Sequence, residues 1–143
     1  MKLSYIHLPY GQNPPQTGGK RPFRAVVVLE QGTSPEWRAQ VSDWLVQSGC
    51  LYMMAWGPDS SAWDDSVDWA NLAAFDGQEI PDDHFVMTTW HDDEPLSETF
   101  WFAEHAACHP TVSIDETVIV DVGPHERRAA LTQMLKDAQQ RTS

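Results

Sequence analysis

Residues 25–56 read AVVVLEQGTSPEWRAQVSDWLVQSGCLYMMAW and decide the fold class. The run at residues 25–29 is continuously apolar and mostly β-branched, which is typical of a strand covered on both faces. Ser34-Pro35 suits the start of a helix, and Gly49 suits its end. A second apolar run at residues 50–56 predicts another buried strand. Strand, helix and strand joined by short connections indicate a parallel β–α–β unit.

The same alternation continues along the chain. We expect further helices at about residues 64–75, at 95–109 and from 124 onward, and strands at 84–90 and 118–122. Residues 112–114 could pair with the last strand as a hairpin. The pattern predicts a single three-layer α/β domain, flavodoxin-like or Rossmann-like, with a mainly parallel sheet of four to five strands. The strand order cannot be read from this pattern.

The first part of the chain differs in composition from the rest. Residues 1–24 contain several prolines and glycines, which exclude a regular helix and predict an extended N-terminal arm around a short strand at 3–8. Residues 25–143 are then expected to form the domain. No apolar run is long enough to span a bilayer, and no secretory signal is recognisable, so we expect a cytoplasmic protein. Cys50 and Cys108 are expected to be free thiols.

Charge is distributed unevenly along the sequence. The net charge is −12, and residues 39–126 contain 18 Asp or Glu but no Lys or Arg. Nucleic-acid binding needs basic side chains near the phosphates, so this balance argues against it. A basic protein surface or a divalent cation would be attracted instead. The simpler alternative is that the acidic surface only keeps the protein soluble.

Ligands of parallel α/β sheets bind outside the carboxyl ends of the strands, so residues after each expected strand are the candidates. The densest titratable cluster is His91 with Asp92, Asp93 and Glu94. His91 could act as a general base beside Asp92, or the carboxylates could bind a hard cation. The alternative is a solvated turn that caps the following helix.

A surface for a basic partner is predicted from aromatic and acidic residues at the same strand ends and at the start of the second expected helix. Its members are Trp56, Asp59, Trp63, Asp64, Asp65, Trp90, Asp93 and Glu94. Ordinary packing of the tryptophans is the alternative. His105, Cys108 and His109 lack further ligands at a suitable spacing, so no metal site is predicted. Standard hydrolase, redox, zincin and dinucleotide motifs are absent from the sequence.

Five segments carry a resemblance to a known family: residues 34–38, 41–46, 51–57, 63–68 and 86–91. They resemble a family of small bacterial proteins defined only as a domain of unknown function, over about residues 22–110. The resemblance implies a bacterial, single-domain protein and no particular activity.

Two functional hypotheses follow from these patterns. The first is a protein-interaction or regulatory factor, for example an immunity-like protein, that binds a basic partner and needs no cofactor. The second is a small-molecule hydrolase or transferase that uses His91 and strand-end carboxylates, with Mg²⁺ or another divalent cation.

Overall fold

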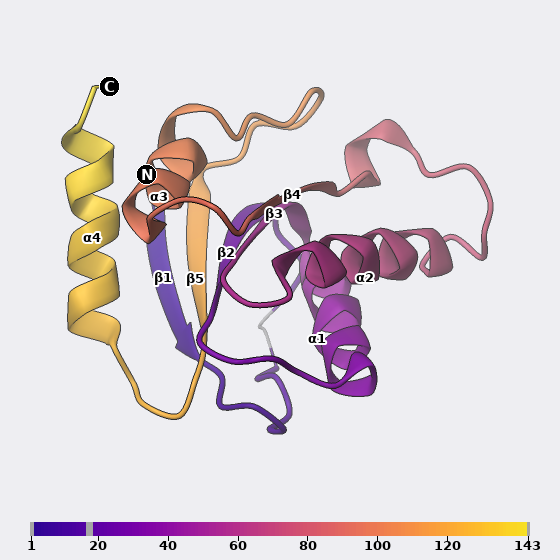
Figure 1. Ribbon diagram of the computed structural model, residues 1–143. Helices are drawn as coiled ribbons and strands as arrows, with labels where there is room; N and C mark the ends of the chain where they lie inside the picture. The colour runs from indigo at the N-terminus through magenta and orange to yellow at the C-terminus, as the bar shows by residue number, and fades with distance from the viewer. Residues whose placement is uncertain (1, 17–18, 143) are drawn as a thin grey trace.

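A computed structural model describes residues 2–16 and 19–142 of the chain, so Met1, Thr17, Gly18 and Ser143 lie outside the described residues. Five strands and four α-helices are described (Figure 1). The strands are β1 (Lys2–His7), β2 (Phe23–Leu29), β3 (Cys50–Trp56), β4 (Met87–His91) and β5 (Glu116–Val122). The helices are α1 (Pro35–Ser48), α2 (Ser60–Ala73), α3 (Leu96–His105) and α4 (Arg128–Gln140), and a short 3-10 turn covers Asp82–His84.

The five strands form one sheet in the order β1-β5-β2-β3-β4, and each neighbouring pair is parallel. The predicted three-layer α/β class is therefore confirmed. The strands β2, β3 and β4 follow one another in one direction across the sheet. Strand β5 returns to the opposite side of β2, so the order reverses between β2 and β5.

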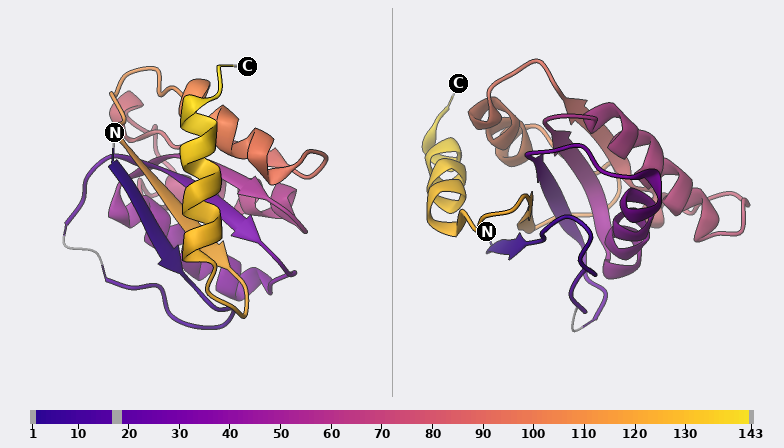
Figure 2. Two further views of the ribbon diagram at one scale, coloured as in Figure 1. Left: turned by 90° about the vertical axis from the view of Figure 1, so that its left-hand side faces the viewer. Right: turned by 60° about the horizontal axis from the view of Figure 1, so that its bottom comes forward.

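Two helices cover each face of the sheet (Figure 1, Figure 2). Alternate residues of β2 explain this arrangement, because side chains of a strand point to opposite faces in turn. Val27 packs in the cluster with α1 and α2, whereas Val26 and Val28 pack in the cluster with α3 and α4. All three valines are fully buried, and burial of each contributes about 1.5–3 kcal/mol. None of the described helices combines the length and the apolar character needed to cross a membrane.

Helix α1 begins and ends where the sequence predicts. The Ser34 hydroxyl accepts a hydrogen bond from the Trp37 backbone N–H at 3.2 Å, which satisfies a free donor of the first turn. Gly49 ends the helix with φ of 107°, and a Cβ there would lie 2.1 Å from the Arg21 carbonyl oxygen. Only glycine combines this backbone conformation with so close a contact.

The N-terminal segment contributes a strand to the sheet and then crosses α1. Strand β1 pairs with β5 along its whole length, from Lys2 beside Glu116 to His7 beside Asp121. Further along, the Trp37 and Trp44 indoles donate to backbone carbonyls of residues 12 and 15, at 2.8 and 2.7 Å. These bonds hold the described part of the segment against α1.

Several expected boundaries differ from the structure. The hairpin at residues 112–114 is not formed in the described residues, because β1 and β2 occupy both edges of β5. Helix α2 begins at Ser60, since the turn at Gly57 already accepts the Ser60 N–H. Strand β4 begins at Met87 rather than residue 84, because the side chain of Asn71 bonds the backbone just before it. Helix α4 begins at Arg128 and not at Pro124.

Candidate functional site

The residues predicted at the strand ends do not form one surface, and two separate places hold most of the candidates. One is the carboxyl ends of β2 and β5, where the strand order reverses and where ligands of such sheets usually bind. The other is the outer side of β4, the last strand of the sheet, together with the face of α2 beside it.

A buried ion cluster occupies the first place. Asp121 is fully buried, accepts a hydrogen bond from the Tyr5 hydroxyl at 2.5 Å and contacts Arg127 at 2.5 Å. Arg127 also pairs with Glu30 at 2.7 Å. Burial, followed by the bond to Asp121, raises the pKa of Tyr5 to about 12. Burial alone would lower the pKa of Arg127, but its bond to Asp121 and the charges of Asp121 and Glu30 raise it. The guanidinium therefore stays charged between two carboxylates.

A shallow cavity of about 530 Å³ lies beside this cluster. Its lining includes Glu30, Gln31, Trp56, Pro58 and Arg127, and Trp56 is the member of the predicted surface that contributes to it. Two carboxylates outnumber the one guanidinium here, so the local charge disfavours an anionic ligand. Sequence reasoning missed Arg127 and Tyr5 because no motif marks them, and their positions depend on β1 and β5 being neighbours.

The second place has an open strand edge. Beyond the ladder with β3, no backbone hydrogen bond joins residues 87–91 to another described segment. Trp90 on this strand is 53% exposed, and Trp69 on α2 is 71% exposed. The neighbouring carboxylates are exposed, except that of Asp64, which is buried on the α2 face that contacts β4. We call this surface the acidic edge; it consists of Asp64, Asp65, Asp68, Trp69, Thr88, Trp90, Asp92 and Asp93.

Two carboxylates of the acidic edge share one hydroxyl group. The Thr88 hydroxyl donates to Asp64 Oδ1, and the same oxygen lies 3.0 Å from Asp68 Oδ1. A hydroxyl carries a single proton, so it cannot satisfy both carboxylates at once. Burial raises the pKa of Asp68; the bond from Thr88 lowers it, and the charges of Asp64 and Asp65 raise it further. Negative charge is therefore incompletely balanced at this point.

His91 does not face Asp92, the partner predicted for it. Its Nδ1 atom lies 2.7 Å from Glu94 Oε1, its Nε2 atom lies 2.9 Å from the Thr89 hydroxyl, and its ring packs on Phe102. The side chain is only 8% exposed, whereas Asp92 is exposed. Both ring nitrogens are thus occupied by protein groups, and the geometry ties the end of β4 to the turn before α3.

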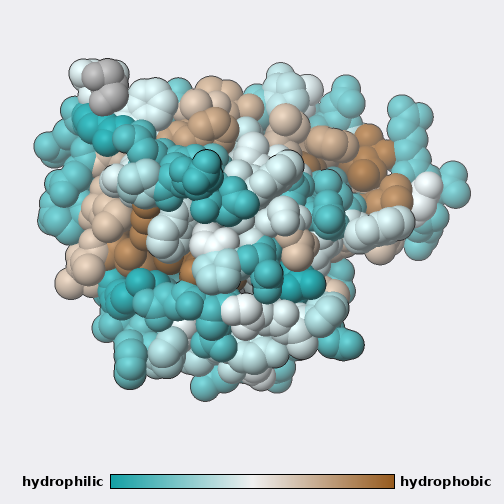
Figure 3. Space-filling model, in the orientation of Figure 1, coloured by the Kyte–Doolittle hydropathy of each residue, from teal (hydrophilic) through white to brown (hydrophobic). Residues whose placement is uncertain are grey.

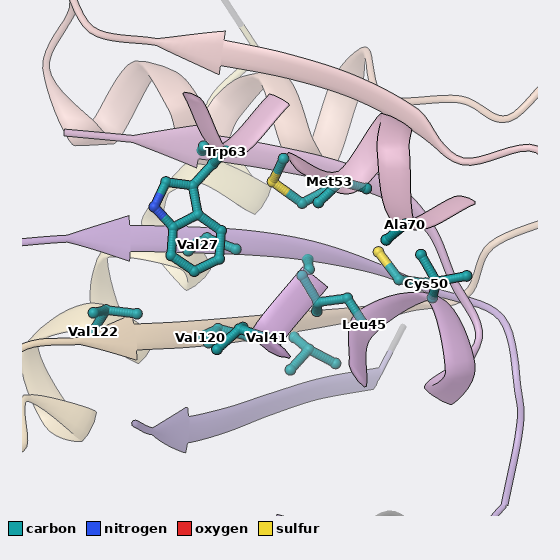
Figure 4. Packing of buried hydrophobic residues seen from close by; sticks show 14 of the residues in the cluster. Val27, Val41, Leu45, Cys50, Met53, Trp63, Ala70, Val120 and Val122 are labelled. Carbon is teal, nitrogen blue, oxygen red and sulfur yellow. The ribbon is translucent and has the colours of Figure 1, made fainter. Parts of the chain in front are cut away.

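The remaining predicted residues are dispersed. Trp63 is fully buried and packs edge-on against Trp37 at 6.1 Å between ring centres, within the cluster that α1 and α2 form on the sheet (Figure 4). It therefore belongs to the core and offers no partner a surface. Asp59 is exposed in the left-handed turn before α2, with φ of 59°. Asp64, Asp65, Trp90 and Asp93 are the predicted partner-binding residues that lie in the acidic edge.

Sequence reasoning missed Asp68, Trp69 and Thr88. A signal for Trp69 was present, because it lies four residues after Asp65 and outside the buried stripe of α2. This spacing places an aromatic residue on the polar face of the helix, outside the core.

No metal site is found among the described residues, and both cysteines are free thiols. Within residues 2–16 and 19–142, no group of three or more His, Cys, Asp or Glu side chains could hold a metal ion. His105 and His109 each bond a backbone carbonyl at 2.8 Å. Cys50 and Cys108 are free, as predicted, and burial raises the pKa of the Cys50 thiol to about 12.

A larger cavity, of about 750 Å³, opens at the amino ends of the strands. Its lining is mainly apolar and includes Pro22, Val46, Leu51, Phe75 and Val86, but none of the predicted site residues. Figure 3 shows apolar residues gathered at the right of the view, where Figure 1 places the segment between α2 and β4.

One protein family matches this chain. The model of the family described as Domain of unknown function (DUF7684) matches residues 3–138, nearly the whole sequence. No curated protein and no solved structure matched.

Proposed function

The chain belongs to the family of that domain, DUF7684, and we propose that it is a protein-interaction factor whose acidic edge binds a basic partner. The observation that carries this proposal is the position of Trp90. Its side chain is 53% exposed on an open strand edge, and the exposed carboxylates of Asp92 and Asp93 follow after His91.

Exposed tryptophans among carboxylates suit a cationic side chain of a partner. An indole face attracts Lys or Arg through its quadrupole, and tryptophan is enriched among the residues that dominate binding energy at protein interfaces. An aromatic side chain also buries roughly 150–250 Å² when it is covered. Trp90, and separately Trp69 on α2, therefore each offer an exposed aromatic side chain near carboxylates.

Four carboxylates of the acidic edge, those of Asp65, Asp68, Asp92 and Asp93, are exposed to a partner, whereas Asp64 is buried. The described ion pairs involve Glu30, Glu94, Glu98, Glu116 and Asp121, and none of the five carboxylates of the acidic edge. Complementary charge raises the association rate and excludes acidic competitors. These properties fit a regulatory or immunity-like factor that must find a basic partner quickly.

A peptide-display selection tests the proposal. A random ten-residue library is selected on the protein, on a variant with Trp90→Ala, Asp92→Asn and Asp93→Asn, and on a control with Asp43→Asn and Asp137→Asn. Asp43 and Asp137 are exposed on α1 and α4, so the control loses the same two charges elsewhere. Peptides rich in Lys and Arg should be enriched on the protein and the control but not on the edge variant. Equal enrichment of basic peptides on the edge variant would contradict the proposal.

One observation bears on a second candidate, a cation-assisted hydrolase or transferase. His91 Nδ1 lies 2.7 Å from Glu94 Oε1, as in a general base with its orienting carboxylate, and Nε2 would act as the base only after a substrate displaced the Thr89 hydroxyl at 2.9 Å. Its test is a calorimetric titration with Mg²⁺ of the protein and of a Glu94→Gln variant. Saturable heat that the variant loses would support the enzyme, and absence of heat would remove the cation-dependent mechanism.

A further inference from the structure

We propose that the acidic edge accepts an extended segment of its partner as a sixth strand beside β4, with Lys or Arg at every second position. This inference rests on the proposed function and specifies how the partner is held. Extended peptides commonly bind in this way to open sheet edges, where main-chain hydrogen bonds provide affinity and alternate side chains provide specificity.

The open edge has a defined length. Before β4, the Asn71 side chain donates to the His84 carbonyl at 3.0 Å and accepts from the Val86 N–H at 2.9 Å, and His109 bonds the Phe85 carbonyl. These three backbone groups in residues 84–86 are therefore already partnered. The free stretch is Met87–His91, which at 3.3 Å per residue offers about 17 Å of strand.

Strand β4 is short, at five residues, but it lacks other common protections of an exposed edge. Edge strands are commonly guarded by Lys, Pro or a bulge, which discourage further pairing. Met87–His91 contains no proline and no lysine, and its register with β3 is regular. The opposite edge strand, β1, carries Lys2. Of the two edges, β4 is the one suited to receive another strand.

Charge distinguishes a basic partner from a second copy of this chain. Asp82 and Asp83 precede β4, and Asp92 and Asp93 follow it. If two copies paired antiparallel through β4, the acidic residues after one strand would lie near those before the other. Like charges opposed across a sheet are destabilising, and each chain carries a net charge of −12. A cationic segment meets attraction at both ends of the same edge.

The two faces of β4 predict the alternation in the partner. Thr88, and with it Trp90, faces α2, because the Thr88 hydroxyl bonds Asp64. Thr89 and His91 face α3, because His91 packs on Phe102. Side chains of an added strand alternate in the same way. Those on the α2 face lie beside Trp90 and the carboxylates, which favours Lys or Arg, and those on the α3 face suit Val or Thr.

The shared hydroxyl of Thr88 gives the cation a specific place. Asp64 and Asp68 both approach Thr88 Oγ1, which can donate to one of them at a time. Asp64 is buried and Asp68 is exposed, so a Lys ammonium group would pair with Asp68 and leave the Thr88 proton to Asp64. Occupation by a cation would bring the raised pKa of Asp68 back down.

Synthetic peptides test strand addition without changing the protein. The probe is an eight-residue peptide of alternating Lys with Val or Thr, blocked at both ends. One control has the same composition with all Lys residues first, and the other keeps the alternation but is N-methylated at every second residue on the edge that pairs. We expect the alternating peptide to bind about tenfold tighter than either control, measured by calorimetry. It should also slow hydrogen exchange of amides in residues 87–91.

The outcomes separate this inference from the proposed function. Equal binding of all three peptides that is lost in the Trp90→Ala, Asp92→Asn, Asp93→Asn variant would overturn strand addition and leave the proposed function standing. If no peptide binds, or if the peptides bind the substituted variant as tightly as the protein, both strand addition and the proposed function are overturned. A dimer in sedimentation experiments, with amides 87–91 protected before any peptide is added, would show that a second copy occupies the edge and would overturn the inference.

Discussion

Thr88 of β4 donates its hydroxyl proton to Asp64 of α2, and this bond joins the edge strand to the helix that carries half of the acidic edge. The same hydroxyl oxygen lies 3.0 Å from Asp68, so a second carboxylate is held beside the first. The strand–helix contact thereby concentrates negative charge where a sheet edge is open.

Asp68→Asn should stabilise the protein at neutral pH. Burial and the neighbouring carboxylates raise the pKa of Asp68 above its ordinary value of 3.8, so its charged form is disfavoured in the folded state. Such a group stabilises the fold at low pH and loses this contribution as pH rises through its folded pKa. We expect a gain of about 0.5 kcal/mol at pH 7 that disappears below pH 3.8, measured by urea unfolding. A loss of stability at pH 7 would contradict the view that negative charge is incompletely balanced at Asp64 and Asp68.

Arg127→Met should destabilise the protein strongly. It leaves the fully buried carboxylate of Asp121 without its cation, and loss of one partner of a buried pair costs about 3–5 kcal/mol. Lys136→Met, an exposed cation on α4, serves as the control and should change the free energy of unfolding by no more than about 0.5 kcal/mol. Equal losses in the two variants would mean that the cluster at β2 and β5 is not a buried pair.

Trp63→Ala should reduce the stability of the protein, whereas Trp90→Ala should mainly reduce its binding of basic peptides. Trp63 is fully buried, so its truncation should cost about 3–5 kcal/mol of unfolding free energy. Trp90 is largely exposed, so its truncation should cost about 0.5 kcal/mol or less while weakening the binding of basic peptides. Urea denaturation and peptide calorimetry on the same samples check both expectations. Normal peptide binding by the Trp90 variant would argue against the acidic edge.

Glu116→Gln should reduce stability at pH 7 but not in acid. Burial would raise the pKa of Glu116, but hydrogen bonds from Arg21 and Ser4 and the charges of Arg21 and Lys2 lower it. Its contribution is therefore present above its ordinary value of 4.5 and lost as pH falls through the folded pKa. We expect a loss of about 1–3 kcal/mol at pH 7, as for a hydrogen-bonded charge.

Glu98→Gln is the matched control for that substitution. Glu98 pairs with Arg141 at 2.8 Å, but both side chains are well exposed. Its loss should therefore cost about 1 kcal/mol or less. If the difference between the two variants does not change between pH 7 and acid, Glu116 does not carry the expected linkage.

The sequence determined the local elements and the class of the fold. Continuous apolar runs, the Ser34 cap and the Gly49 stop each act within a few residues, so the β–α–β unit could be predicted without knowledge of distant contacts. The confinement of Lys and Arg to the two ends of the chain was equally plain. The hairpin at 112–114 was wrong because the occupants of both β5 edges, β1 and β2, lie far away in sequence.

Only the tertiary structure decided which candidate residues meet. The placement of β5 between β1 and β2 brings Tyr5 and Arg127 to Asp121, although more than a hundred residues separate Tyr5 from the other two. The position of β4 at the sheet edge exposes Trp90, whereas α2 directs Trp63 into the core. Local periodicity records which side chains are apolar, but strand order depends on non-local contacts. For that reason the sequence predicted an acidic, tryptophan-bearing surface, and the tertiary structure determined which residues belong to it.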